Sequence, residues 1–234
     1  MIVYWCHVIF MEITLGICGS AGRKDDAKKM SKHLFDAGCI VASGLIDQLK
    51  ESNYEITHLI SGGAAFIDFV AVKLFLEKKV PYLRLFIPCE WDDGIFKSKI
   101  EKDEGSTLNY YHKKFQTTTG INSLSQMQIA KMEGAEFIVV EGGFYARNYL
   151  VAKSSDFILA MTFGNGNQVK QGGTAHCVRC YLDKIKKKGG FDKSFHYNLS
   201  DGKIYVGCTA PPEERTDNFK RTKLRSIMGI PSAP

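Results

Sequence analysis

The feature that most constrains the fold of this chain lies between residues 156 and 174. Residues 157–163 form an apolar run with the length and composition of a buried strand. The glycine- and asparagine-rich residues 164–167 end this run, and two more glycines lead into residues 174–185, which are predicted to be helical. A strand, a glycine loop and a helix start in this order direct backbone N–H groups and the positive end of a helix dipole to one place. The stretch therefore predicts a site for a phosphate or a carboxylate.

The N-terminal half of the chain repeats this arrangement of strands and helices. Three short apolar runs are predicted to be strands: residues 13–18, 58–61 and 81–88. Three amphipathic stretches are predicted to be helices: residues 25–35, a stretch after Gly38 through residues 40–49, and residues 66–79. Strands that alternate with helices favour a parallel sheet with right-handed crossovers. We therefore expect an α/β fold, a Rossmann-like open and mostly parallel sheet with helices on both faces.

A long polar segment then interrupts the alternation. Residues 91–120 are polar, charged and aromatic by turns, and are long for a connector, so we expect a lid, an oligomer contact or a mobile loop. Residues 122–132 and 149–154 have helical patterns, and residues 137–140 are a short strand or a buried loop. Residues 203–207 are expected to form a last, edge strand.

Three segments describe the expected domain organisation. Residues 1–10 form an N-terminal extension, and residues 11–208 form one Rossmann-like domain with an insertion at about 92–135. Residues 209–234 form a basic C-terminal arm with the composition of a linker or a disordered tail.

The charge and composition are those of a globular protein. The chain has 234 residues, 44% of them hydrophobic and 24% charged, which is enough to bury a sizeable core. The net charge is +6, and the surplus gathers in residues 184–188 and 215–225. A solvated helix end and a loose tail explain this better than a nucleic-acid groove does, so we expect at most weak nucleic-acid binding through the basic tail.

The cysteines and the N-terminal residues indicate the cellular compartment in which the protein is expected. Seven cysteines without regular disulfide spacing indicate free thiols, which favour the cytoplasm. Cys177 and Cys180 form a C-x-x-C motif without a second pair, so no metal site is expected. The apolar residues 1–10 lack the basic region of a signal peptide, and no run reaches the length of a membrane span, so no membrane association is expected.

Four glycine-bearing segments stand at strand ends or helix starts: residues 16–23, 61–65, 142–148 and 164–174. The carboxyl ends of parallel strands share one edge of an open sheet, and ligands bind in the crevice there. Four such segments at one edge predict a phosphate-bearing small molecule as ligand. The expected ligand-binding residues are Gly19, Ser20, Gly22, Arg23, Ser61, Gly62, Gly63, Ala64, Asn148, Gly164, Gly172, Gly173 and Thr174.

Two charged residues and the hydroxyl residues have more than one interpretation. Arg147 is either a surface residue or a phosphate clamp at a glycine-rich helix start. Asp68 is either a partner of a helix dipole or a residue that orients the glycine loop or a ligand hydroxyl. Ser20 and Ser61 are either helix caps or phosphate contacts, and Thr174 is expected to be both.

The glycine spacing also bears on dinucleotide cofactors. Gly16, Gly19 and Gly22 have the spacing of a dinucleotide-binding loop. The acidic residue that such a loop requires about twenty positions later has no clean candidate. We therefore expect neither NAD nor FAD, and no cofactor.

These motifs resemble the SLOG superfamily of Rossmann-like proteins, most closely its YspA-type branch. The resemblance covers roughly residues 11–190, with 92–135 poorly matched. It rests on five segments: Gly19-Ser-Ala-Gly22, Ser61-Gly-Gly-Ala64 with Asp68, Ala146-Arg-Asn148, Asp156 to Ala160, and Gly172-Gly-Thr-Ala-His176. Related members are the LOG phosphoribohydrolases and the DNA-processing protein DprA. The resemblance implies binding of a nucleotide or a nucleotide derivative in the glycine-lined crevice.

The resemblance also bears on activity. In the LOG motif a glutamate and an upstream arginine are essential to catalysis; here Arg147 matches the arginine, but Cys177 stands at the glutamate position. Asp68, Glu141 and His176 are the candidates for the missing acid or base. We expect a homo-oligomer that binds a nucleotide-derived small molecule, in the manner of SLOG ligand-binding or sensing proteins. The alternatives are an N-glycosidase that cleaves nucleoside monophosphates, and a DprA-like binder of single-stranded DNA.

Overall fold

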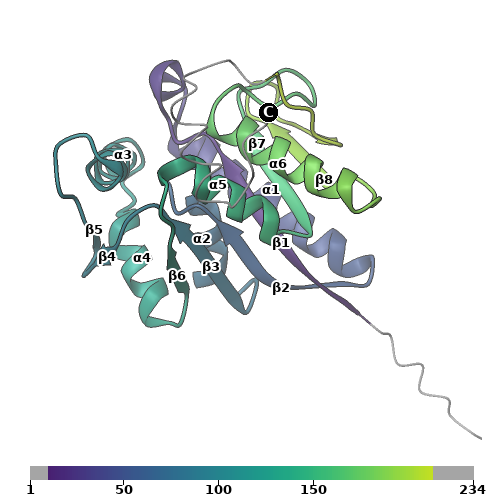
Figure 1. Ribbon diagram of the computed structural model, residues 1–234, viewed down its shortest axis with the longest axis horizontal. Helices are drawn as coiled ribbons and strands as arrows, with labels where there is room; N and C mark the ends of the chain where they lie inside the picture. Colours follow the sequence, from purple (N-terminus) through teal and green to yellow (C-terminus); the bar gives the residue numbers. More distant parts are fainter. Residues whose placement is uncertain (1–9, 213–234) are drawn as a thin grey trace, which may run out of the picture.

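A seven-stranded sheet forms the centre of the structure, a computed structural model that describes residues 10–212 (Figure 1). The strands lie in the order β6-β3-β2-β1-β7-β8-β9. Their bounds are β1 Met11–Gly19, β2 Tyr54–Ser61, β3 Tyr82–Ile87, β6 Glu136–Val139, β7 Phe157–Thr162, β8 Ser194–Asn198 and β9 Lys203–Val206. Every neighbouring pair is parallel except β8 and β9. Residues 1–9 of the expected extension and residues 213–234 of the expected arm lie outside the described residues.

Helices cover both faces of this sheet, which confirms the expected Rossmann-like α/β fold. Helices α1 Lys32–Glu51 and α2 Phe69–Leu76 pack on one face. Helices α5 Gly143–Ser154 and α6 Gly173–Lys187 pack on the other. The molecule therefore has three layers, with the sheet in the middle.

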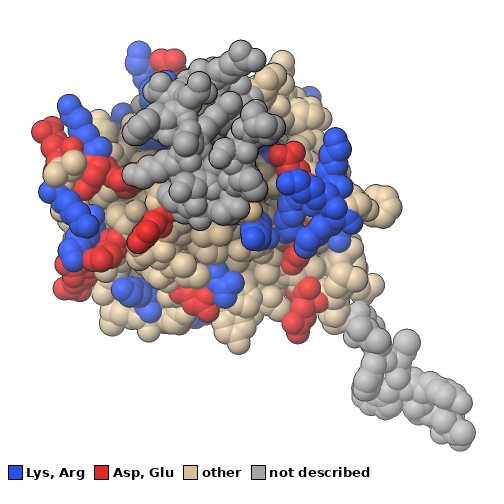
Figure 2. All heavy atoms as spheres, in the orientation of Figure 1, with Lys and Arg blue, Asp and Glu red and all other residues tan. Residues whose placement is uncertain are grey.

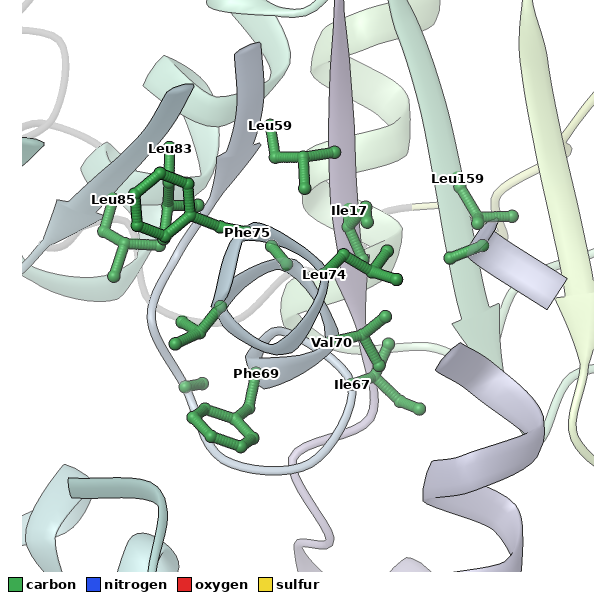
Figure 3. Packing of buried hydrophobic residues seen from close by; sticks show 14 of the residues in the cluster. Ile17, Leu59, Ile67, Phe69, Val70, Leu74, Phe75, Leu83, Leu85 and Leu159 are labelled. Carbon is green, nitrogen blue, oxygen red and sulfur yellow. The ribbon is translucent and has the colours of Figure 1, made fainter. Parts of the chain in front are cut away.

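The alternation of side chains along the strands builds the two cores. Successive residues of a strand point to opposite faces of a sheet. In β1, Leu15 and Ile17 join the core under α1 and α2, whereas Cys18 joins the core under α5 and α6. Figure 3 shows Val70 and Leu74 of α2 packed close to Ile17, on the first of these faces.

The first helix differs from its prediction. Residues Lys24–Lys28 form a short 3-10 helix, and α1 begins only at Lys32, where the Ser31 side chain accepts a hydrogen bond from the Leu34 N–H group. The break expected near Gly38 is absent, because Gly38 is a buried residue within α1. A Cβ atom there would lie 3.3 Å from the sulfur of Met161 and 3.6 Å from Val70. This glycine therefore serves close packing of the helix against the sheet rather than a chain break.

Other bounds also differ from the prediction. Helix α2 begins at Phe69 rather than at residue 66, because Phe66 has a φ of 59° and stands outside the helical region. Helix α5 begins at Gly143, six residues earlier than expected, because the two glycines of the loop, with positive φ, turn the chain directly into the helix. The parallel strand β8 was not predicted, since its short polar and aromatic sequence Ser-Phe-His-Tyr-Asn gives no apolar run.

The insertion, expected as a lid, an oligomer contact or a mobile loop, is folded into regular elements, most of which the sequence did not predict. It contains the two-stranded hairpin of β4 Trp91–Asp92 and β5 Ile95–Phe96, and then α3 Glu104–Thr119 and the predicted helix α4 Ser123–Met132. Asp103 starts α3 by accepting a hydrogen bond from the Ser106 N–H group at 2.8 Å. The sequence signals for α3 were Asp103 three residues before Ser106 and the helical spacing of Leu108 and Phe115, within an otherwise polar stretch.

His112 of α3 connects the insertion to the glycine loop after β2. Its Nε2 lies 3.1 Å from the Gly63 carbonyl oxygen, and its Nδ1 lies 2.8 Å from the Ser123 hydroxyl. Because a carbonyl only accepts, Nε2 carries the proton and Nδ1 accepts from Ser123. Complete burial lowers the pKa of His112 from 6.5 to about 4, and the bond to Gly63 only partly offsets this.

We expect His112→Ala to lower the free energy of unfolding by about 1–3 kcal/mol at pH 7, because it leaves the Gly63 carbonyl group buried without its donor. The folded pKa lies below the unfolded one, so the stabilisation by neutral His112 is complete above pH 6.5 and falls as the pH drops towards about 4. The difference between wild type and variant in urea unfolding should shrink over this interval. His33→Ala, at an exposed site of α1, is the control; an equal, pH-independent loss in both variants would contradict the role of His112.

Candidate functional site

The candidate site lies where the strand order reverses direction. From β1 the chain proceeds outward through β2, β3 and β6, whereas β7, β8 and β9 extend from the other side of β1. The adjacent carboxyl ends of β1 and β7 mark this switch point, which is where open α/β sheets bind ligands. A cavity of about 350 Å³ opens there. Its lining comes from the ends of these two strands, the loops that follow them, the loop after β2, and the starts of α5 and α6.

The structure brings most of the predicted ligand residues to this cavity. Ten predicted residues line it: Gly19, Ser20, Arg23, Ala64, Asp68, Arg147, Asn148, Gly172, Gly173 and Thr174. Seven predicted residues do not line it: Gly22, Ser61, Gly62, Gly63, Glu141, Gly164 and His176. Ser61 is occupied elsewhere, since its hydroxyl donates to the backbone oxygens of Ile17 and Asp68. Gly164 closes a turn, and a Cβ atom there would lie 2.0 Å from the Gln168 carbonyl oxygen.

A buried ion pair stands at the back of the cavity. The Asp68 carboxylate accepts hydrogen bonds from the Gly19 N–H at 3.1 Å and the Ala64 N–H at 3.4 Å, and lies 3.8 Å from the Arg147 guanidinium. Both side chains are less than a tenth exposed. Burial raises the pKa of Asp68, and Arg147 opposes this rise. Burial likewise lowers the pKa of Arg147, against the attraction of Asp68. Each charge therefore depends on the other to remain ionised.

Arg147 also joins segments that are distant in the sequence. One guanidinium nitrogen donates to the Gly62 carbonyl oxygen at 2.6 Å, and two others donate to the Asn148 side-chain oxygen. The Asn148 amide in turn donates to the Gly173 carbonyl oxygen at 2.9 Å. The loop after β2, the start of α5 and the start of α6 are thus held together by one arginine and one asparagine.

Gly19 shows how closely these segments approach. A Cβ atom at this position would lie 2.3 Å from Ile67 and 2.4 Å from the Met161 carbonyl oxygen. Only glycine fits between β7 and the turn that precedes α2. The first of the predicted glycines is therefore required by packing, whatever the ligand.

A second polar network, which the sequence did not predict, also lines the cavity. The Ser20 hydroxyl donates to one oxygen of the buried Asp26 at 2.7 Å, and Lys170 forms an ion pair with the other. The Lys170 N–H group also donates to the hydroxyl of Thr162, at the end of β7. Only the positions of the two residues in the sequence could have indicated this network. Asp26 follows the first glycine loop, and Lys170 lies in the loop after the apolar run 157–163.

Arg23 is held by aromatic rings rather than by a carboxylate. Its guanidinium lies 4.8 Å from the ring centre of Phe144 and 5.0 Å from that of Tyr111, which the insertion helix α3 contributes. Its Nε is buried and has no hydrogen-bond partner among the described residues. Arg23 therefore brings to the cavity a positive charge that forms no ion pair with an acidic side chain of residues 10–212.

The start of α6 adds free donors to this positive cavity. Gly172, with a φ of 137°, is the N-cap residue, and it makes no side-chain cap hydrogen bond. The expected capping by Thr174 is therefore not found, because Thr174 is the second residue inside the helix. The first N–H groups of a helix have no partner within the helix and carry the positive end of its dipole. These groups lie beside the lining residues Gly172, Gly173 and Thr174.

The side-chain charges of the lining reinforce the helix dipole. The lining holds four cationic and two acidic side chains: Arg23, Lys24, Arg147 and Lys170, with Asp26 and Asp68. The two acids pair with Arg147 and Lys170, which leaves two positive charges in excess. The lysines of residues 184–188 do not contribute, since they lie in the last turn and C-cap of α6, at the far end from the cavity. Figure 2 shows basic side chains gathered on the surface over this helix end.

The candidate acid and base residues are placed very differently. Asp68 lines the cavity, whereas Glu141 is exposed outside it. His176 lies behind the lining residue Tyr145, with the two ring centres 4.8 Å apart. Cys177 is 1% exposed and packs in the core under α5 and α6, where it interacts with Cys18. A side chain at the position of Cys177 therefore points into the core in this structure.

Metal binding and membrane crossing leave no structural sign in the described chain. Between residues 10 and 212, no group of three or more His, Cys, Asp and Glu side chains is placed to hold a metal ion. None of the helices in this range is long and apolar enough to cross a membrane.

The fold and the cavity define a Rossmann-like α/β protein with a glycine-lined, positively charged pocket at the switch point of its sheet. The chain belongs to the same family as "Uncharacterized protein R261" of Acanthamoeba polyphaga mimivirus. The two are 37% identical over 164 residues, which is 70% of this chain and 87% of the viral protein. No protein-family model matches the chain. No solved structure matches it either.

We expect Arg147→Met to lower the free energy of unfolding by about 3–5 kcal/mol, because it leaves the buried Asp68 carboxylate without its cation. Asp68→Asn in the same chain should recover part of this loss, since the amide oxygen can still accept from Gly19 and carries no charge. Urea unfolding of both variants measures the two effects. A loss below about 1 kcal/mol in Arg147→Met, or no recovery in the double variant, would show that the ion pair does not organise the site.

Proposed function

We propose that the protein binds a nucleotide or a nucleotide derivative through its phosphate in the cavity at the switch point. One observation supports this most directly: the uncapped start of α6 opens into a cavity whose side chains carry two positive charges in excess. Helix starts and arginine side chains are recurrent partners of phosphate groups in proteins. The cavity volume of about 350 Å³ lies within the range of small-molecule sites.

The polar residues suggest a division of roles within the site. The N–H groups near Gly173 and Thr174 bind the phosphate together with Arg23, whose guanidinium has donors to spare. Asp26 accepts hydrogen bonds from ligand hydroxyls such as those of a ribose, since carboxylates are the natural acceptors in a positive cavity. Arg147 acts mainly through the ion pair with Asp68 and the contacts to Gly62 and Asn148. This arrangement supports membership of the SLOG superfamily, which we propose on the motifs of the sequence and on this geometry.

We expect isothermal titration to detect binding of at least one common nucleoside monophosphate at low ionic strength. Arg23→Met should weaken this binding about tenfold to a hundredfold, because a charge-assisted hydrogen bond contributes about 1.5–3 kcal/mol. Arg84→Met is the matched control, since Arg84 pairs with Glu136 on neighbouring strands and does not line the cavity. The proposal would be refuted if none of the nucleotides bound, or if wild type and Arg23→Met bound them with equal affinity.

A second candidate function is hydrolysis of the N-glycosidic bond of a nucleoside monophosphate. The observation that favours it is the Asp26 carboxylate, which lines the cavity beside Ser20 and the cation of Lys170. A carboxylate in this position can stabilise positive charge at the anomeric carbon or accept the proton of an attacking water. Asp26 thus offers a carboxylate at the cavity, whereas Cys177, at the position of the LOG glutamate, is buried in the core and does not line it.

Incubation with the four common ribonucleoside monophosphates, followed by chromatography, tests the hydrolase. If the candidate is right, free base and ribose 5-phosphate appear, and Asp26→Asn reduces the rate about a hundredfold or more. Asp25→Asn, at the exposed neighbouring residue, should leave the rate unchanged. Absence of free base with every nucleotide would exclude the hydrolase for these substrates and leave the binding proposal standing.

A further inference from the structure

Two aromatic residues at the start of α5, Phe144 and Tyr145, line the cavity and have different neighbours. The ring of Phe144 faces the guanidinium groups of Arg23 and Arg147, at 4.8 and 5.4 Å from its centre. Phe144 therefore serves to hold the two arginines in place. Within residues 10–212, its neighbour Tyr145 forms no cation–π contact with either arginine.

The side chain of Tyr145 is available to contact a ligand in the cavity. It is 42% exposed although it lines the cavity. Its ring meets His176 edge to face, with the ring centres 4.8 Å apart and the planes at 85°. Its hydroxyl makes no hydrogen bond with any residue between 10 and 212. The packing of His176 against the ring fixes the orientation of Tyr145, and the residue keeps a large exposed surface where it lines the cavity.

The position of Tyr145 relates it to the anion site. His176 belongs to the first turn of α6, so the ring in contact with it stands next to the free N–H groups of that helix start. A ligand whose phosphate is bound at α6 can therefore place a second, planar group against Tyr145. Planar heterocycles stack on aromatic side chains with little dependence on the particular base.

We propose that Tyr145 is the stacking platform for the base of the ligand, and hence that the site takes phosphates that carry a planar heterocycle in preference to simple sugar phosphates. This inference rests on the proposed phosphate site at α6 and adds the class of the ligand's second group. The role belongs to the ring of Tyr145 and not to its hydroxyl, which has no hydrogen-bond partner within residues 10–212. The stacking proposal also predicts that the base of the ligand contributes to affinity independently of Arg23.

A comparison of two ligands on three variants tests this inference. The affinities of the tightest-binding nucleoside monophosphate and of ribose 5-phosphate are measured by titration calorimetry for the wild type, Tyr145→Ala and Tyr145→Phe. We expect Tyr145→Ala to lower the affinity for the nucleotide about tenfold to a hundredfold. The affinity for ribose 5-phosphate should change less than about twofold. Tyr145→Phe should bind both ligands as the wild type does. Tyr82→Ala, an exposed tyrosine at the opposite, amino-terminal end of β3, is the control and should change neither affinity.

The possible failures are distinguishable. One failure is that nucleotides bind while Tyr145→Ala leaves their affinity unchanged, or lowers the affinity for ribose 5-phosphate by the same factor. In either case the stacking role is wrong and the phosphate site stands. If wild-type protein binds ribose 5-phosphate as tightly as every nucleotide, the preference for a heterocycle is wrong. If neither class of ligand binds, the proposed function and the stacking role both fail.

Discussion

The buried ion pair between Asp68 and Arg147 is the interaction on which the arrangement of the cavity depends. Asp68 holds the loop after β1 through the Gly19 N–H group, and Arg147 holds the loop after β2 through the Gly62 carbonyl oxygen. Asn148 extends this connection to the start of α6. Because both charges are dehydrated, neither is tolerated without the other, and the pair specifies one relative placement of four segments.

The groups that build the site are largely separate from the groups that remain available to a ligand. Arg147, Asp68 and Phe144 are occupied with one another or with the backbone. Arg23, the start of α6 and the ring of Tyr145 keep free donors, charge or surface at the cavity. The insertion takes part in this construction, since α3 supplies Tyr111 against Arg23 and His112 against the glycine loop. A preorganised site of this kind spends little of its binding energy on rearrangement.

The sequence predicted the fold class and most of the segments that meet at the cavity, because apolar runs followed by glycine loops are local signals of parallel strands. It did not predict the pairing of Lys170 with Asp26 or the stacking of Tyr111 on Arg23. These contacts join residues from distant parts of the chain, and charge or aromaticity alone does not reveal partners. Helix starts were the least accurate, since Phe66 and Gly143 owe their conformations to packing and to positive φ angles rather than to periodicity. Gly38 shows the converse, a residue expected to break a helix that serves its packing instead.

The central claim is that a phosphate binds at the start of α6, beside Arg23. Backbone amide NMR of the full chain, titrated with a nucleoside monophosphate, tests the location directly. The account predicts that the amide signals of Gly173 and Thr174 shift most, together with those of the loop that carries Arg23, and that those of residues 184–188 at the other end of α6 stay unchanged. Shifts confined to the basic end of α6, or no shifts at saturating nucleotide, would contradict it.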